Sequence, residues 1–212
     1  HSDLITVRCG NSFTASNMRL VKLPIETSRL SSATFRSLTT FLSLVDNDLL
    51  VLCLIILPRF DPIEVLKAME EHKATVFGGV PTMYWALLNS VDKSKVDINI
   101  ISSNLRICSS GGSSLPVEVL KNFEERFKVP ILEGYGLSET SPAITFNHMG
   151  RERKPGSVGQ PVWGIEIKVV DENGQEVKIK DTGEIIVRGH AVMKGYYNNP
   201  EGTKDALKGG WF

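Results

Sequence analysis

The hydrophobic pattern over residues 57–145 changes period repeatedly, as it does where helices and strands alternate. At 61–64 an acidic N-cap, a proline and a first-turn glutamate mark a helix start, so a helix is predicted over 61–73. The segments that follow are predicted as strands over 74–80, 104–110 and 129–133, and as helices over 82–91 and from Pro116 onward. The apolar face of the last helix is formed by Val117, Leu120, Phe123 and Phe127.

The order of these elements indicates an α/β fold. Strands alternating with helices at these lengths predict a parallel sheet with helices on both faces over about 57–145, and ligands of such sheets bind beyond the carboxyl ends of the strands. After about residue 156 the pattern becomes a two-residue alternation over 165–170, followed by a turn at Asn173 and Gly174 and a second strand over 184–188. This pattern predicts a small antiparallel β-subdomain over about 156–212, closed by a short helix from Asn199 to Lys208.

The chain therefore divides into three parts. Residues 1–56 stay unassigned, because 28–44 has helical length but no clean apolar face. Residues 57–150 form the α/β unit, and residues 151–212 form the β-subdomain, which we expect to be truncated at its C-terminal end. The longest apolar run, 49–57, is far shorter than the roughly 20 residues that cross a bilayer, so it predicts a buried strand and no transmembrane segment.

Composition narrows the choice of partners and compartment. The chain has 212 residues, with 24 Lys plus Arg against 24 Asp plus Glu, so no global field attracts nucleic acid or an anionic membrane. Any bound phosphate must be held locally. The three cysteines, Cys9, Cys53 and Cys108, have no disulfide or metal spacing and indicate reduced thiols in a cytoplasmic protein, with peripheral contact at a membrane left open.

Both ends of the chain suggest that it is part of a longer protein. It begins with His1 and ends on Trp211 and Phe212, two large apolar residues that favour burial. We therefore expect cut ends, and self-association through them.

The first candidate ligand loop is 109–114, between a strand and a helix start. Its glycines allow a ligand close to the backbone, and a helix start supplies unpaired N–H groups for an anion or a polar ring. The alternative is an ordinary loop in which Ser114 is the helix N-cap.

The second candidate loop is 133–142, and it contains more chemistry. Tyr135 stands between two glycines, which would leave clear space on both sides of its ring for a purine to stack. Ser138 offers a hydroxyl to a phosphate oxygen, and Glu139 offers a hard oxygen to Mg²⁺. The alternative is a tight turn with a packed tyrosine.

A third loop, 189–197, follows a strand and contains Lys194, Tyr196 and Tyr197; here core packing of the aromatic pair is the favoured interpretation over a ligand contact. The histidines point to no hydrolase, because neither His72 nor His148 pairs with a serine or cysteine at a nucleophile elbow.

Several blocks of sequence together resemble the adenylate-forming enzymes, also called the ANL or AMP-binding superfamily. The string EGYGLSETSP at 133–142 is similar to the Tyr-Gly-x-Thr-Glu core of that family, with Ser138 in place of the usual threonine. The other blocks are FGGVPTMY at 77–84, GGSSLP at 111–116, PGSVGQP at 155–161, GEIIVRG at 183–189 and VMKGYYN at 192–198. In order and spacing they resemble the long-chain fatty acyl-CoA ligases in particular, over about 57–212.

The resemblance implies an ATP-dependent acyl-CoA ligase, which uses ATP and Mg²⁺ to convert a fatty carboxylate to acyl-AMP and then transfers the acyl group to coenzyme A. It implies that Ser138 contacts the α-phosphate and that Glu139 binds Mg²⁺. The residues that it places around the nucleotide are Gly111, Gly112, Ser113, Glu133, Gly134, Tyr135, Gly136 and Leu137. Those that it places along the acyl tunnel are Gly136, Pro142 and Ala143.

The same resemblance exposes what is missing. The family's phosphate loop with its lysine belongs upstream of residue 57, and nothing in 1–56 matches it. Its ribose-binding aspartate and its C-terminal domain would follow Phe212. We therefore expect ATP or AMP, fatty acid and coenzyme A to be partners of a full-length parent, and this fragment alone to be inactive. The alternative is a non-catalytic module that binds a nucleotide or acyl-adenylate.

Overall fold

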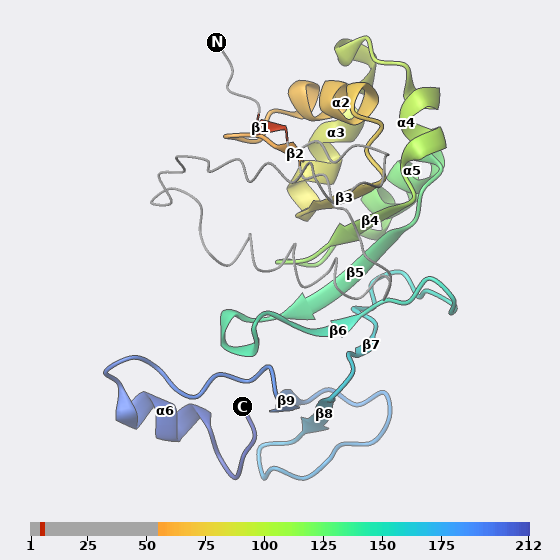
Figure 1. The fold of residues 1–212 in the computed structure, drawn as a ribbon. Helices are drawn as coiled ribbons and strands as arrows, with labels where there is room; N and C mark the ends of the chain where they lie inside the picture. The colour runs from red at the N-terminus through yellow and green to blue at the C-terminus, as the bar shows by residue number, and fades with distance from the viewer. Residues whose placement is uncertain (1–4, 7–54) are drawn as a thin grey trace, which may run out of the picture.

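The computed structural model (Figure 1) describes residues 5–6 and 55–212, so the apolar run before Ile55, together with Cys9 and Cys53, lies outside the described residues. The helices are α2 (Pro62–Glu71), α3 (Pro81–Ser94), α4 (Ile98–Asn104), α5 (Val117–Phe127), the 3₁₀ turn η1 (Ser138–Thr140) and α6 (Pro200–Ala206). The strands are β1 (Ile5–Thr6), β2 (Ile55–Ile56), β3 (Val76–Gly79), β4 (Ile107–Ser110), β5 (Ile131–Gly136), β6 (Ala143–Phe146), β7 (Gln160–Pro161), β8 (Ile165–Val170) and β9 (Glu184–Gly189).

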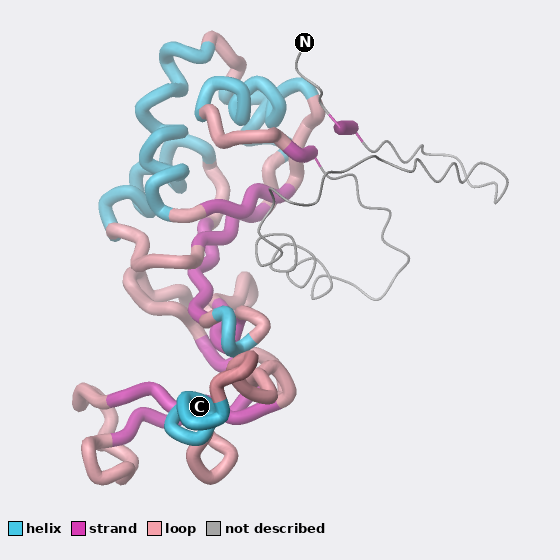
Figure 2. Tube along the Cα trace, turned by 90° about the vertical axis from the view of Figure 1, so that its left-hand side faces the viewer, coloured by secondary structure: helices cyan, strands magenta, loops and turns pink. Residues whose placement is uncertain are grey.

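The predicted α/β fold is confirmed, with a parallel sheet flanked by helices. Strands β3, β4 and β5 are parallel neighbours, and helices connect them in the expected alternation. Beyond β5 the same sheet continues with two antiparallel strands, β6 and β7, which the sequence pattern did not predict. Figure 2 shows the helical layer (cyan) at one end of the molecule and the small antiparallel subdomain at the other, with the sheet between them.

Local signals explain where the helices begin. Asp61 caps α2 as predicted, because its Oδ1 accepts hydrogen bonds from the N–H groups of Ile63 at 2.9 Å and Glu64 at 3.0 Å. Helix α4 was not predicted; it occupies 98–104, so β4 begins three residues later than Asn104, the predicted start of the strand. Asp97 caps this helix by accepting a hydrogen bond from the N–H group of Asn99 at 2.9 Å. Within the described residues, no helix has the length and apolar character needed to cross a membrane.

The main core lies between the sheet and helices α2 to α5. Tyr84, Phe123 and Phe127 are fully buried there: Tyr84 meets Phe123 edge-on at 5.0 Å between ring centroids, and Phe123 stacks on Phe127 at 4.1 Å. The Tyr84 hydroxyl donates a hydrogen bond to the carbonyl of Ser109 at 2.5 Å, which ties α3 to β4. Val117 was wrongly predicted on the apolar face of α5, because its side chain is 39% exposed.

Cys108, also in this core, is a buried free thiol on β4. Burial raises the pKa of that thiol, so it stays protonated and unreactive.

The turn from β5 to β6 reverses the chain within a very small space. A Cβ atom on Gly136 would lie 1.7 Å from the carbonyl oxygen of Pro142, so only glycine fits. Thr140, fully buried beneath the turn, accepts a hydrogen bond from the N–H of Leu137 at 2.9 Å and donates one to the Pro142 carbonyl at 2.6 Å. The Leu137 N–H also reaches the Pro142 carbonyl, at 2.9 Å. These bonds close residues 136–142 into a compact ring.

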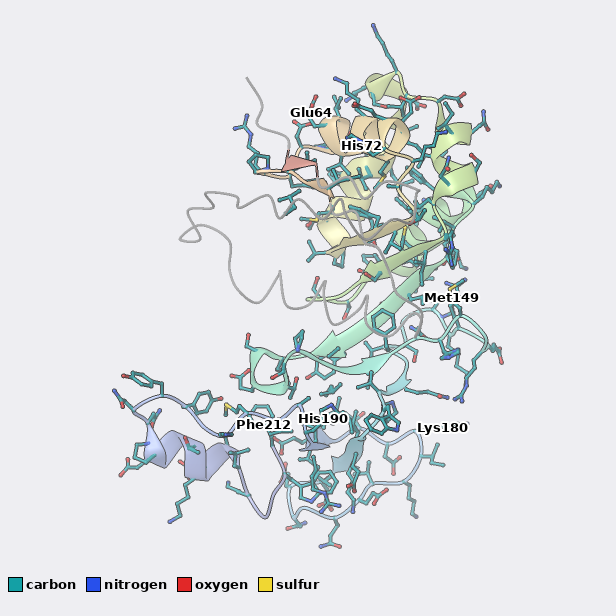
Figure 3. All side chains as sticks on the ribbon, in the orientation of Figure 1. Glu64, His72, Met149, Lys180, His190 and Phe212 are labelled. Atoms are coloured by element: carbon teal, nitrogen blue, oxygen red, sulfur yellow. The ribbon has the colours of Figure 1, made fainter. Side chains whose placement is uncertain are left out.

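The predicted β-subdomain is present as β8 paired antiparallel to β9, from Ile165 opposite Gly189 to Val170 opposite Glu184. Its turn at Asn173 and Gly174 is also present, with the Asp171 carboxylate accepting hydrogen bonds from the N–H groups of Asn173 and Gln175, both at 2.9 Å. Phe212 lies beside β9 (Figure 3), where it exchanges two backbone hydrogen bonds with Val187.

A second apolar cluster fastens this subdomain to the sheet. Its buried members are Ile144 of β6, Ile165 of β8 and Val187 of β9. Partly buried residues that pack against it are Tyr135, Val162, Ile167, Ala191, Val192 and Phe212. The end of β5 and the end of β9 therefore meet over shared hydrophobic contacts.

Replacing Phe123 with alanine should destabilise the fold by about 3–5 kcal/mol, because it removes a fully buried ring that contacts two other aromatic rings. The free energy of unfolding in urea measures this. The matched control, Val117→Ala on the exposed side of the same helix, should change stability by less than about 0.5 kcal/mol. Equal losses in the two variants would contradict this description of the core.

Gly136→Ala should open the β5–β6 turn, because the new Cβ cannot coexist with the Pro142 carbonyl. We expect a loss of about 1–3 kcal/mol and faster hydrogen exchange at the Leu137 amide, whose partner is that carbonyl. Gly150→Ala is the control, since a Cβ there would come no nearer than 3.4 Å to its first neighbour, the His148 side chain. Unchanged exchange at Leu137 in Gly136→Ala would show that the turn is looser than described.

Candidate functional site

The first and second candidate loops meet at the carboxyl edge of the parallel strands. Strands β4 and β5 are in register from Cys108 opposite Ile131 to Ser110 opposite Glu133, so the segments that follow them leave the sheet side by side. A Cβ on Gly111 would lie 3.5 Å from the carbonyl oxygen of Gly134, which places the two loops in van der Waals contact. Gly112 and Ser113 are exposed at this edge.

Glu133 connects these loops from inside the protein. Its side chain is only 5% exposed, and its carboxylate accepts hydrogen bonds from the N–H groups of Leu115, which directly follows the first loop, and Gly156 in the 155–161 block. Burial raises the pKa of Glu133, and the two N–H groups oppose that rise. Its carbonyl accepts a hydrogen bond from the backbone N–H of Asn147 at 2.9 Å. Glu133 thus fixes the positions of the surrounding loops.

One detail of the alternative interpretation of the first loop, the N-cap at Ser114, is wrong. Ser114 is not the N-cap of the following helix: Pro116 occupies that position, and no side chain caps the helix start. The N–H of Leu115 is instead directed to the Glu133 carboxylate.

Tyr135 is half-buried and lies against the second apolar cluster. The positions that side chains would take at the two flanking glycines are filled. The Phe146 ring lies 2.4 Å from the position of a Cβ on Gly134, and the Pro142 carbonyl occupies the corresponding place at Gly136. The glycines are therefore explained by chain packing, and the tyrosine ring combines one packed side with a part that remains exposed.

Ser138 and Glu139 lie together in η1, on the ring closed by Thr140. Ser138 is exposed and Glu139 is half-buried, so both side chains can reach a ligand at the edge of the sheet. Leu137 lies just before them with its N–H engaged inside the ring, and Pro142 and Ala143 close the far side beside Gly136.

The third loop contacts Glu139 directly, which the sequence did not reveal. The Met193 N–H donates a hydrogen bond to the Glu139 carbonyl at 2.7 Å, and the Tyr196 hydroxyl donates one to Glu139 Oε1 at 3.1 Å. This hydrogen bond to Glu139 raises the pKa of Tyr196. The interpretation of the aromatic pair as core residues is wrong, because Tyr196 is 40% and Tyr197 93% exposed.

The metal-ligating oxygen available at this edge fits a Mg²⁺ ion that takes most of its other ligands from phosphates. In residues 5–6 and 55–212, no three His, Cys, Asp or Glu side chains are grouped as a metal cage. Glu139 does offer a carboxylate whose Oε1 is held by Tyr196 and whose Oε2 has no hydrogen-bond partner in the described part of the chain. One carboxylate together with nucleotide phosphates is a common way for Mg²⁺ to be held.

Comparison with known proteins identifies the family. Residues 50–197 match the model of the AMP-binding enzymes. A long-chain-fatty-acid–CoA ligase of Bacillus subtilis is 43% identical over 159 residues, which is 74% of this chain and 28% of that ligase. An oxalate–CoA ligase of Arabidopsis thaliana is 35% identical over 156 residues, covering 73% of this chain and 30% of that enzyme.

A solved structure agrees with this match. The anthranilate CoA ligase AuaEII in complex with anthranoyl-AMP superimposes with a TM-score of 0.68 at 31% identity, over 76% of this chain and 30% of that one. The chain thus spans less than a third of the length of each of these relatives. The family model covers residues 50–197, which include the first two candidate loops and the five-stranded sheet. The chain therefore belongs to the AMP-binding enzymes, the adenylate-forming superfamily that includes the acyl- and aryl-CoA ligases.

Proposed function

We propose that this chain supplies part of the adenylate site of an ATP-dependent ligase that activates a fatty carboxylate as acyl-AMP and transfers the acyl group to coenzyme A. The observation that supports this most directly is the meeting of two ligand loops at the carboxyl edge of β4 and β5, held by one buried carboxylate, Glu133. Because residues 50–197 match the AMP-binding enzymes, the ligand expected at that edge is an adenine nucleotide.

For the nucleotide base, we propose a slot between the first loop and Tyr135. Gly111 lies at the contact between the loops, and Gly112 and Ser113 are exposed beside it. A purine would stack on the exposed part of the Tyr135 ring. Glu133 and Gly134 would support the slot from below, because one is buried and the other packs against Phe146.

For the reaction, we propose that Ser138 contacts the α-phosphate and that Glu139 binds the metal. The substrate carboxylate attacks the α-phosphorus, a new P–O bond forms, and the bond to the β-phosphate breaks with release of pyrophosphate. The Ser138 hydroxyl would donate a hydrogen bond to an oxygen of the attacked phosphorus, where negative charge increases. Mg²⁺, when bound, supplies positive charge to the phosphate oxygens, and Glu139 would hold it through a carboxylate oxygen.

For the acyl chain, we propose the surface of the β5–β6 turn. Gly136, Pro142 and Ala143 line this turn and are half-buried, so they present small apolar surfaces next to Ser138. A fatty acid is favoured as the substrate because a relative at 43% identity is named a long-chain-fatty-acid–CoA ligase. The names of other relatives include oxalate and anthranilate, so the substrate is the part of the proposal that needs its own test.

The proposal predicts ATP–pyrophosphate exchange that depends on a fatty acid, measured on the full product of the gene that encodes this chain. Ser138→Ala and Glu139→Gln should each lower the exchange rate by about 10²–10³-fold, since each removes a group that acts on the phosphates. Glu172→Gln is the control, because it makes the same change at an exposed residue of the β8 turn and should leave the rate unchanged.

The acid that supports exchange decides the substrate class. Exchange with aromatic acids or oxalate but not with long-chain fatty acids would reject the fatty substrate and keep the ligase. An inactive but folded protein that still binds a non-hydrolysable acyl-AMP analogue in calorimetry would instead support a non-catalytic binding module. Absence of both exchange and binding would reject the proposed function.

A further inference from the structure

The third loop reaches the proposed metal ligand through two separate hydrogen bonds. One comes from the backbone of Met193 and fixes the main chain at Glu139; the other comes from the Tyr196 hydroxyl and fixes one oxygen of its carboxylate. The two partners are 57 residues apart in the chain, so the contact depends on the tertiary fold.

Tyr196 is held in place independently of Glu139. Its backbone N–H donates a hydrogen bond to Thr203 Oγ1 at 2.9 Å, and the Thr203 hydroxyl donates one to the carbonyl of Asn199 at 2.7 Å. The Asn199 side chain in turn caps α6 by accepting a hydrogen bond from the Gly202 N–H at 2.9 Å. The tyrosine is therefore anchored on the first turn of α6 before its hydroxyl meets the carboxylate.

The Glu139 side of the contact is equally fixed. Glu139 lies in η1, whose last residue, Thr140, is fully buried and closes the ring at 136–142. The third loop approaches this ring because Ala191 and Val192 pack against the second apolar cluster. The main chain at both ends of the hydrogen bond is thus held by the fold, and the two side chains meet from fixed backbone positions.

From this arrangement we propose that Tyr196 is a positioning residue for the metal–nucleotide complex: its hydroxyl holds Glu139 Oε1 and leaves Oε2 oriented to bind the cation. The inference rests on the proposed function, in which Glu139 binds Mg²⁺. A glutamate side chain loses rotamer freedom when it binds a metal, and a carboxylate that is already oriented loses less. Groups that orient a metal ligand in this way affect metal affinity without touching the metal.

Tyr196→Phe tests this, because it removes only the hydroxyl and keeps the ring. We expect the Mg²⁺ concentration for half-maximal fatty-acid-dependent exchange to rise about tenfold, with a much smaller change in the maximal rate. A second measurement does not depend on turnover: electron paramagnetic resonance of Mn²⁺ with a non-hydrolysable ATP analogue should show weaker binding of the metal–nucleotide complex by the same factor. Affinity for the metal-free analogue should not change, whereas a general structural defect would weaken both.

The adjacent residue provides a matched control. Tyr197→Phe makes the same chemical change at a ring that is 93% exposed, and all these measurements should match the wild type. In a Glu139→Gln background, Tyr196→Phe should have little further effect on metal–nucleotide affinity, because the two residues act through one ligand.

The outcomes separate the inference from the function on which it rests. If the wild-type protein shows neither exchange nor metal–nucleotide binding, the proposed function fails. If the wild type is active and Tyr196→Phe behaves like Tyr197→Phe, the inference alone is overturned. Tighter metal binding in Tyr196→Phe would also overturn it, since the hydroxyl would then compete with the cation for Glu139.

Discussion

The closure of the chain at Gly136 and Pro142 is the constraint on which the rest of the site depends. Just before this point, β5 changes from parallel pairing with β4, which ends at Glu133, to antiparallel pairing with β6, which begins at Gly134, and the register shifts between Tyr135 and Gly136. The reversal is possible because residue 136 is a glycine: the Pro142 carbonyl occupies the position that a side chain on Gly136 would take. It leaves Ser138 and Glu139 on a short 3₁₀ turn whose underside is closed by a buried threonine hydroxyl. Two polar side chains are thereby held at the edge of the sheet by backbone geometry.

Two glutamates in the same motif perform different tasks because their surroundings differ. Glu133 is buried and accepts hydrogen bonds from backbone N–H groups of two loops, so its negative charge is used within the protein. Glu139, six residues later in the chain, is half-buried and has one oxygen held by Tyr196. The first carboxylate is engaged in holding loops, whereas the second has one oxygen, Oε2, without a hydrogen-bond partner in the described part of the chain. Sequence spacing alone cannot distinguish these roles, because both residues flank the same tyrosine.

Elements with local signals were predictable, and contacts between distant segments were not. The helix capped by Asp61 and the alternating strand β8 were predicted close to their observed bounds, since capping residues and period-two alternation are short-range features. Helix α4 was missed because it is short and its one buried residue, Ile101, gives no period. The antiparallel direction of β6 and the contact of Tyr196 with Glu139 depend on how the second apolar cluster folds the chain back, which no local pattern encodes.

The glycines on either side of Tyr135 illustrate how a functional motif is also a folding motif. They were interpreted as leaving space for a base to stack on the tyrosine, and the positions that their own side chains would take are filled by the Phe146 ring and the Pro142 carbonyl. Close backbone packing therefore explains why these positions lack side chains, with no ligand required. Ser138 has no such explanation, because its side chain is exposed and the side-chain hydrogen bonds that close the turn are made by Thr140. In the part of the chain that the structure describes, Glu139 makes one side-chain hydrogen bond, which it accepts from the hydroxyl of the exposed Tyr196. Within the motif, the residues that packing does not account for are the polar ones, Ser138 and Glu139, and this is why the proposed function assigns the phosphate and metal contacts to them.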